Sequence, residues 1–165
     1  MEHARALHVL VLCTGNSARS ILAEGIFNAA GNGRIAAYSA GSKPQGTPHP
    51  EALKVLRAKG HDTDFARSKS WDEFAGQDSP QMDLIVTVCD NAAAETCPVW
   101  PGHPASVHWG LPDPAAVSGD AHEVRRAFES TYRELHRRVS EFVNLPLEEL
   151  DAADLVQAAR QIGSF

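Results

Sequence analysis

The segment Leu7–Ser20 reads LHVLVLCTGNSARS. The apolar run at its start predicts a strand that is buried in a sheet. Cys13 follows this run directly, and the small residues after it predict a loop that leads into a helix near Arg19. The segment therefore places a cysteine at the end of a strand and an arginine at the start of a helix.

The loop between Cys13 and Arg19 has the composition of an anion-binding site. Its small side chains leave an anion close access to the backbone amides, and the positive end of the helix adds to the attraction. Arg19 supplies a guanidinium fork that matches a tetrahedral oxyanion. The residues that we expect to bind the oxyanion are Thr14, Gly15, Asn16, Ser17, Ala18 and Arg19.

Cys13 is the expected nucleophile of this loop. The loop amides and Arg19 stabilise a thiolate, so we expect the pKa of Cys13 to lie below the ~8.5 of a free cysteine. Ser20 is expected to donate a hydrogen bond to that thiolate. A purely structural cysteine at a strand end is the alternative, which the small-residue loop and Arg19 disfavour.

Strands and helices alternate along the rest of the chain. Apolar runs predict further strands at 35–39, 84–88 and 106–108, and apolar spacing predicts helices after the loop and at 51–59, 120–143 and 154–162. We predict an α/β fold, a three-layer open sheet of four parallel strands with helices on both faces. Ligands of such sheets bind beyond the carboxyl ends of the strands. Cys13, Cys89 and Asp113 each end or follow a predicted strand, so we expect them at one edge.

Length and charge are those of one ordinary globular domain. The chain has 165 residues, with 15 Lys and Arg against 21 Asp and Glu, and its formal net charge is −6. We expect a single domain over 1–165, in which 146–165 is a helical extension packed on the rest. The acidic balance disfavours nucleic acid or an anionic membrane as a partner. Three cysteines are too few for a secreted disulfide scaffold, which favours a cytoplasmic protein with reduced thiols.

Several short motifs of this chain occur together in one known family. Residues 13–19 form a C-x5-R pattern, Ala23-Glu24-Gly25 follows it, and Ser39-Ala40-Gly41 and the stretch 108–114 lie further along. The combination resembles the low-molecular-weight protein tyrosine phosphatase fold. The Thr-Gly-Asn-Ser form of the loop resembles the arsenate reductases built on that fold, of the thioredoxin-coupled type. The resemblance covers residues 7–143 and implies an arsenate reductase.

The resemblance also implies a role for each cysteine. Cys13 attacks arsenate to form a thiol–arsenate adduct, and Asp113 is the general acid that helps an oxygen leave arsenic. Cys89 then attacks Cys13, arsenite leaves, and a disulfide remains. Cys97 next attacks Cys89, and thioredoxin, or glutaredoxin with glutathione, reduces the final disulfide. Phosphate and sulfate are the expected analogues of arsenate at this site.

The residues themselves leave other interpretations open. Cys89 also suits a small core position at a strand end, and Cys97 suits a loop position without a redox role. Asp113 lies between two prolines, which is also typical of a turn aspartate. Cys89 and Cys97, with His103 and His108, are alternative zinc ligands, but the cysteines are too widely spaced for a zinc finger. We therefore expect no metal ion held by these residues.

A phosphatase is the alternative function, because it shares the first chemical step. Hydrolysis of a phosphomonoester through a cysteinyl-phosphate needs no electrons, whereas reduction of arsenate needs two. Ala115–Val117 follow Asp113 at positions where phosphatases of this fold typically carry aromatic residues, which disfavours phosphotyrosine as substrate. Ala18 replaces a frequent cysteine and leaves Cys89 and Cys97 as the redox pair. We expect weak phosphatase activity, since the loop cannot readily distinguish phosphate from arsenate.

A potassium site is a further implication of the resemblance, because some arsenate reductases of this type bind potassium beside the loop. Asn16, Glu24 and Ser39 match residues of that site, and Asp72 is the candidate to complete it. The alternative is a buried hydrogen-bond network of Asn16, Glu24 and Ser39 without an ion. We expect no tightly bound cofactor.

Overall fold

The computed structural model describes residues 6–76, 79–88 and 105–163. Cys89, Cys97 and His103, which the sequence analysis singled out, lie outside these residues. The elements in chain order are β1 (Leu7–Leu12), α1 (Arg19–Gly31), β2 (Ile35–Ala40), α2 (Pro50–Ala58), the 3-10 helix η1 (Trp71–Phe74), β3 (Leu84–Thr87), β4 (Ala105–His108), the 3-10 helix η2 (Pro114–Ala116), α4 (Ala121–Val143) and α5 (Ala152–Gly163).

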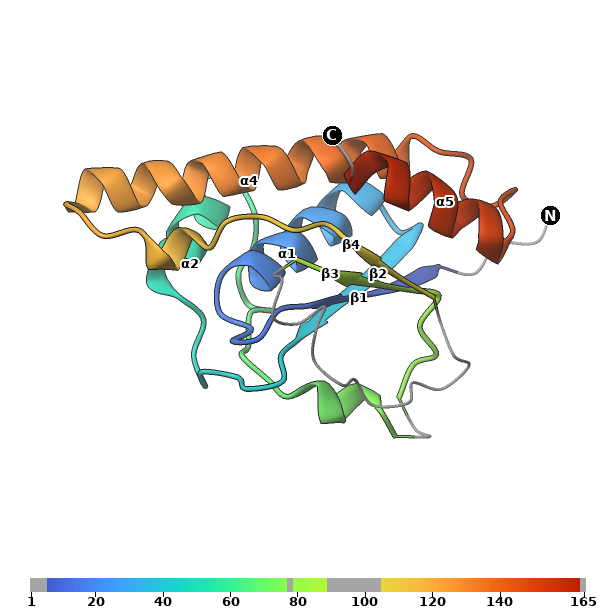
Figure 1. Ribbon diagram of the computed structural model, residues 1–165, viewed down its shortest axis with the longest axis horizontal. Helices are drawn as coiled ribbons and strands as arrows, with labels where there is room; N and C mark the ends of the chain where they lie inside the picture. The colour runs from blue at the N-terminus through green and yellow to red at the C-terminus, as the bar shows by residue number, and fades with distance from the viewer. Residues whose placement is uncertain (1–5, 77–78, 89–104, 164–165) are drawn as a thin grey trace.

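The four strands form one parallel sheet in the order β2-β1-β3-β4 (Figure 1). Val11 of β1 lies opposite Ser39 of β2 and Val86 of β3, so the strands pair in register across the centre of the sheet. Parallel neighbours cannot be joined by hairpins and need crossover connections. This sheet confirms the α/β class and the four parallel strands that the sequence predicts.

Helices cover one face of the sheet, and the short helix η1 lies on the other (Figure 1). Consecutive residues of a strand point to opposite faces. On β2, the Ser39 hydroxyl donates to the Glu24 carboxylate of α1 at 2.5 Å, whereas the ring of Tyr38 contacts that of Phe74 in η1, 5.5 Å between centroids. α4 and α5 pack on the same side of the sheet as α1, which gives the layered arrangement expected from the sequence.

Large aromatic side chains fill the layer between the sheet and the helices. Trp109 is fully buried and stacks on Phe27 of α1, with 5.8 Å between the ring centroids. Phe142 of α4 meets both rings edge-on. The Trp109 indole donates to the Ala159 carbonyl of α5 at 2.8 Å, which ties the last helix to the end of β4.

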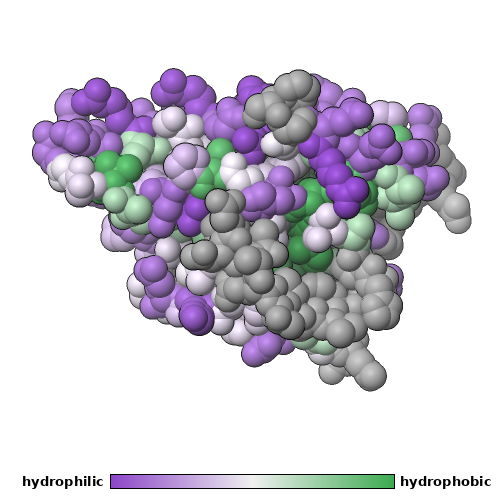
Figure 2. Space-filling view, in the orientation of Figure 1, coloured by the Kyte–Doolittle hydropathy of each residue, from purple (hydrophilic) through white to green (hydrophobic). Residues whose placement is uncertain are grey.

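The outer surface along α4 is hydrophilic (Figure 2). Arg137 makes ion pairs with Glu134 and Glu141 on the same helix, 2.6 and 3.1 Å long. Within the described parts of the chain, no helix combines the length and the apolar character required to cross a membrane.

Candidate active site

Backbone hydrogen bonds from a neighbouring segment to its carbonyl groups hold the loop from Cys13 to Ala18. The Thr14, Gly15 and Ser17 carbonyls accept hydrogen bonds of 2.9–3.0 Å from the backbone amides of the segment 43–49. In a trans peptide the N–H points away from the C=O. The N–H groups of Gly15, Asn16 and Ala18, which share peptide planes with these carbonyls, therefore point to the opposite side, where an anion can bind them.

Asn16 braces the loop from within. Its backbone has a φ of 43°, in the left-handed region that asparagine tolerates better than most residues. The buried side chain donates to the hydroxyls of Ser20, at 2.8 Å, and Ser39, at 3.0 Å, and accepts from the Lys69 amide at 2.8 Å. Because Ser20 accepts from Asn16, its own hydroxyl hydrogen remains available for the predicted donation to Cys13.

Gly41 lets the loop approach the end of β2. A Cβ atom at this position would lie 2.6 Å from the Cys13 carbonyl oxygen and would also collide with the Thr14 carbonyl. The Cys13 amide donates to the Ala40 carbonyl at 3.2 Å, which fixes Cys13 beside β2. Cys13 itself is buried, with 5% of its surface exposed.

Arg19 lies between the loop and the segment that carries Asp113. One terminal nitrogen donates to the Leu111 carbonyl at 2.8 Å, and the other lies 3.7 Å from Asp113 Oδ2. The buried Nε has no hydrogen-bond partner among the described residues. An unsatisfied buried donor costs roughly 1–3 kcal/mol. The N-terminus of α1 is likewise not capped by a side chain, so both features suit an anion at this point.

Asp113 has the turn role that the sequence offered as one alternative, and its role as the acid stays a prediction. Its Oδ1 accepts from the Ala115 amide at 2.9 Å and caps η2, as a turn aspartate does. Its Oδ2 faces Arg19, and 40% of the side chain is exposed. The cap holds the Asp113 carboxyl group at the edge of the sheet where Cys13 lies, and both residues line the same cavity.

These residues line one polar cavity of about 210 Å³. Its lining residues are Cys13, Thr14, Gly15, Ser17, Ala18, Arg19, Lys43, Gln45, Asp113 and Ala115. Asn16 and Ser20 are fully buried in the framework of the loop and are absent from the lining. No aromatic side chain is among the lining residues that the structure describes.

Lys43 and Gln45 are site residues that the sequence analysis missed. They belong to a segment rich in Pro and Gly, which it predicted only as a loop. The Lys43 and Gln45 amides bond to the Thr14 and Gly15 carbonyls, and this backbone pairing carries both side chains to the cavity. No spacing in the sequence signals a contact that arises from such a long-range pairing.

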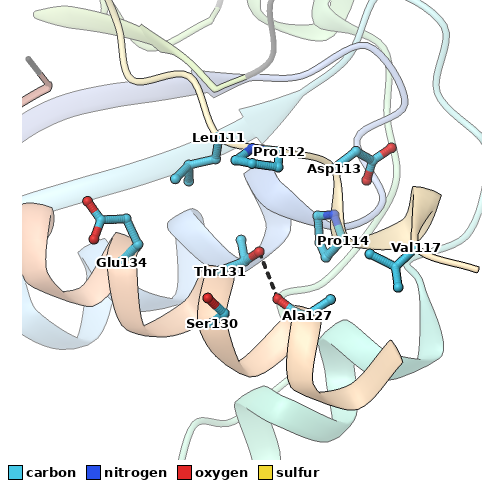
Figure 3. A pocket seen from close by; sticks show the side chains of 9 residues that line it. All are labelled: Leu111, Pro112, Asp113, Pro114, Val117, Ala127, Ser130, Thr131 and Glu134. Carbon is cyan, nitrogen blue, oxygen red and sulfur yellow. Dashed lines mark hydrogen bonds between the residues drawn. The ribbon is translucent and has the colours of Figure 1, made fainter. Parts of the chain in front are cut away.

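A second hollow of about 360 Å³ lies on the other side of the Asp113 segment, against α4 (Figure 3). Leu111, Pro114 and Val117 give it an apolar rim, and Glu134 lies at one end. The Asp113 carboxylate points away from this hollow (Figure 3), in keeping with its approach to Arg19. This hollow therefore offers apolar surface, whereas Cys13, Arg19 and the Asp113 carboxylate face the first cavity.

The end of β3 also meets this edge of the sheet. The Val88 amide donates a hydrogen bond of 3.0 Å to the Leu12 carbonyl. Val88 precedes Cys89 in the sequence and Leu12 precedes Cys13, so the residues just before the two cysteines are hydrogen-bonded to each other. The redox roles of Cys89 and Cys97 stay predictions. Among the described residues no group of three or more His, Cys, Asp and Glu side chains is arranged to hold a metal ion. Of the alternative zinc ligands only His108 is described, and its Nδ1 lies 2.8 Å from the Thr87 hydroxyl.

Known proteins are similar to this chain in sequence and in fold. The sequence profile described as "Low molecular weight phosphotyrosine protein phosphatase" matches residues 8–154. An arsenate reductase of Halalkalibacterium halodurans is 35% identical over 134 residues, which cover 81% of this chain and 93% of that protein. An arsenate reductase of Bacillus subtilis has the same identity and the same coverage.

A solved structure agrees with these relatives. The crystal structure of an arsenate reductase from Archaeoglobus fulgidus has a TM-score of 0.63 and 30% sequence identity, and the match covers 83% of this chain and 99% of that one. The oxyanion loop after β1 and the parallel sheet are therefore features of a shared fold. The chain belongs to the low molecular weight phosphotyrosine protein phosphatase family, and its sequence and fold are similar to those of the arsenate reductases in that family.

Proposed function

We propose that this protein is an arsenate reductase in which Cys13 is the nucleophile. The observation that carries the proposal is the buried Arg19 Nε, which has no hydrogen-bond partner among the described residues, beside a small polar cavity that Cys13 and Asp113 also line. A cavity of about 210 Å³ suits one small oxyanion. Relatives named arsenate reductase, which match over most of their own length, indicate that the oxyanion is arsenate.

The first step is a displacement at arsenic. Arg19 and the loop amides hold three oxygens of arsenate and neutralise their charge. The Cys13 thiolate attacks arsenic, an As–S bond forms, and one As–O bond breaks. Asp113 gives its proton to the departing oxygen, which leaves as water. The 3.7 Å distance between Asp113 Oδ2 and Arg19 supports Asp113 as this acid.

The second step supplies two electrons. The Cys89 thiolate attacks the Cys13 sulfur, an S–S bond forms, and the electron pair of the As–S bond stays on arsenic, which leaves as arsenite. Cys97 then attacks Cys89 and frees Cys13. An external dithiol reduces the Cys89–Cys97 disulfide. Thioredoxin is the reductant that we propose, with glutaredoxin and glutathione as the alternative.

This relay works only where cysteines are kept reduced, so we propose the cytoplasm as its location. The apolar run of Val86 and Val88 brings the chain to the edge of the sheet where Cys13 lies, and Cys89 is the next residue. That connectivity supports Cys89 as the first thiol of the relay.

Weak phosphatase activity is the second function that we propose. The same loop accepts phosphate, which has the charge and shape of arsenate. Ala115 lines the cavity, and no aromatic side chain is among the described lining residues to hold a phenol ring. We therefore expect slow hydrolysis of aryl phosphates through a cysteinyl-phosphate, with Asp113 as the acid.

A paired assay tests both functions. Arsenate reduction is followed as NADPH consumption with thioredoxin and thioredoxin reductase, in parallel with glutaredoxin and glutathione. Hydrolysis of p-nitrophenyl phosphate is measured on the same preparations. We expect Cys13→Ser to abolish both activities, and Cys89→Ser and Cys97→Ser to abolish catalytic reduction only.

Retained ester hydrolysis in Cys89→Ser and Cys97→Ser is the internal control for folding, because hydrolysis needs one thiol. Full arsenate turnover in both variants would contradict the relay. Rapid ester hydrolysis by the wild-type protein without NADPH consumption would make it a phosphatase.

A further inference from the structure

A lysine ammonium is buried behind the oxyanion loop. Lys69 is 6% exposed. Its Nζ donates to the Arg67 carbonyl at 3.0 Å and to the Ser39 hydroxyl at 3.5 Å, and it lies 3.6 Å from Glu24 Oε1. Ser39 and Glu24 match residues of the potassium site that the resemblance implies, and here the positive charge beside them is supplied by the chain itself.

The residues present do not fit a separate potassium ion. Asn16 Oδ1 accepts from the Lys69 amide, and Ser39 Oγ donates to Glu24 while it accepts from Asn16. The oxygens that the ion would need are thus engaged, and the ammonium would repel a second cation at this range. Asp72, expected to complete the site, is an exposed residue of η1.

Burial acts on both partners of the pair. It raises the pKa of the Glu24 carboxyl, and the nearby ammonium opposes that rise. It lowers the pKa of the Lys69 ammonium, which the Glu24 carboxylate opposes. Each group therefore supports the charge of the other, although Ser39 and Arg67 also favour the Glu24 carboxylate and Glu73 also favours the Lys69 ammonium. Removal of either partner leaves the other charge buried with less compensation.

We propose that the Lys69 ammonium replaces a monovalent cation and that Lys69 is a positioning residue for the oxyanion loop. Its amide holds Asn16, whose backbone shapes the loop, and its ammonium orders the Ser39 and Glu24 side chains against Asn16. The loop therefore needs no added cation to bind an oxyanion. The proposal concerns oxyanion binding and rests on the proposed function only for its kinetic readout.

The wild-type protein gives the first test. Phosphate affinity, by isothermal titration calorimetry, and the melting temperature are compared in KCl and in choline chloride at equal ionic strength. We expect the phosphate Kd to differ by less than about twofold and the melting temperature to be the same. A potassium-specific tightening of about fivefold or more would overturn the proposal. Phosphate binding does not require reduction of arsenate, so this result stands apart from the proposed function.

Chemical rescue gives the second test. In choline chloride, Lys69→Ala is expected to weaken phosphate binding by about tenfold, to raise the KM for arsenate more than it lowers kcat, and to recover in part when ammonium or potassium chloride is added. Lys69→Met fills the space without the charge and should weaken binding in every salt. Lys54→Ala, at an exposed lysine of α2, is the matched control and should bind as the wild-type protein does.

Wild-type phosphate affinity in Lys69→Met would refute the role of the ammonium. A loss in Lys69→Ala that no cation restores would show a merely structural role. If Lys69→Ala does not fold, the salt comparison on the wild-type protein decides.

Discussion

Replacement of Gly41 by alanine tests the packing of the loop, because it adds only one methyl group. A methyl group there would meet the Cys13 and Thr14 carbonyls, which are backbone atoms and cannot rotate away. We expect Gly41→Ala to lower the free energy of unfolding by about 1–3 kcal/mol and to weaken phosphate binding by about tenfold or more. Urea unfolding and calorimetry measure the two effects. Gly76→Ala is the control, because its Cβ would meet only the Ser79 hydroxyl at 3.9 Å. Unchanged phosphate affinity in Gly41→Ala would contradict the described packing.

A substitution at Asp113 can separate its proposed role as the general acid from its role as the cap of η2. In Asp113→Asn the remaining oxygen still accepts from the Ala115 amide, since asparagine caps helices as well as aspartate does. We expect kcat for arsenate reduction to fall by about a hundredfold, while the phosphate Kd changes by less than about threefold. Asp120→Asn, at the cap of α4, makes the same change away from the cavity and should leave kcat unaltered. An unaltered kcat in Asp113→Asn would leave Asp113 as a turn residue only.

Single residues were predictable where the chemistry is local in the sequence. Cys13 and Arg19 stand within one short loop, and the structure places both at one cavity with Asp113. Lys43, Gln45 and Lys69 were not predictable, because each reaches the loop through backbone pairing or burial that depends on the whole fold. Lysine is usually exposed, and the partners of the buried Lys69 ammonium, which are the Arg67 carbonyl, Ser39 and Glu24, are brought together only by the fold.

At the scale of elements, Trp109 joins β4 to α5. Its fully buried ring stacks on Phe27, and its indole nitrogen donates to Ala159. We expect Trp109→Phe to lower the free energy of unfolding by about 1–3 kcal/mol, from the lost hydrogen bond and the smaller ring. Urea denaturation measures this. Val117→Ala, at an exposed side chain of the same connection, should change stability by less than about 0.5 kcal/mol. Equal effects of the two changes would contradict the packing of α5 on β4.

The long elements follow from apolar periodicity, whereas their ends and the short helices depend on side-chain caps. The last helix begins at Ala152, two residues before its predicted start, because Asp151 accepts from the Asp154 amide at 2.8 Å. The helix η2 was not predicted, since three residues are too few to show a period. Its cap by Asp113 nevertheless positions the carboxyl group that we propose as the acid.

At the scale of the whole molecule, the strand order explains why the site lies at β1. The chain passes from β1 to β2 on one side and later places β3 and β4 on the other. The connection after β1 therefore runs to one side and the connection after β3 runs to the other, and open sheets bind ligands at the switch point between two such strands. The sequence predicted parallel strands and a shared edge for Cys13 and Asp113. It did not predict the strand order, because apolar runs do not state which strands are neighbours.

The central claim, that this chain carries electrons to arsenate from its own thiols, is tested most directly by an anaerobic single turnover. The protein is fully reduced, the reductant is removed, arsenate is added, and thiols are titrated after denaturation, with phosphate as the control. We predict the loss of two of the three thiols with about one arsenite formed per chain, and no loss with phosphate. Three surviving thiols and no arsenite would contradict the relay and leave a phosphatase.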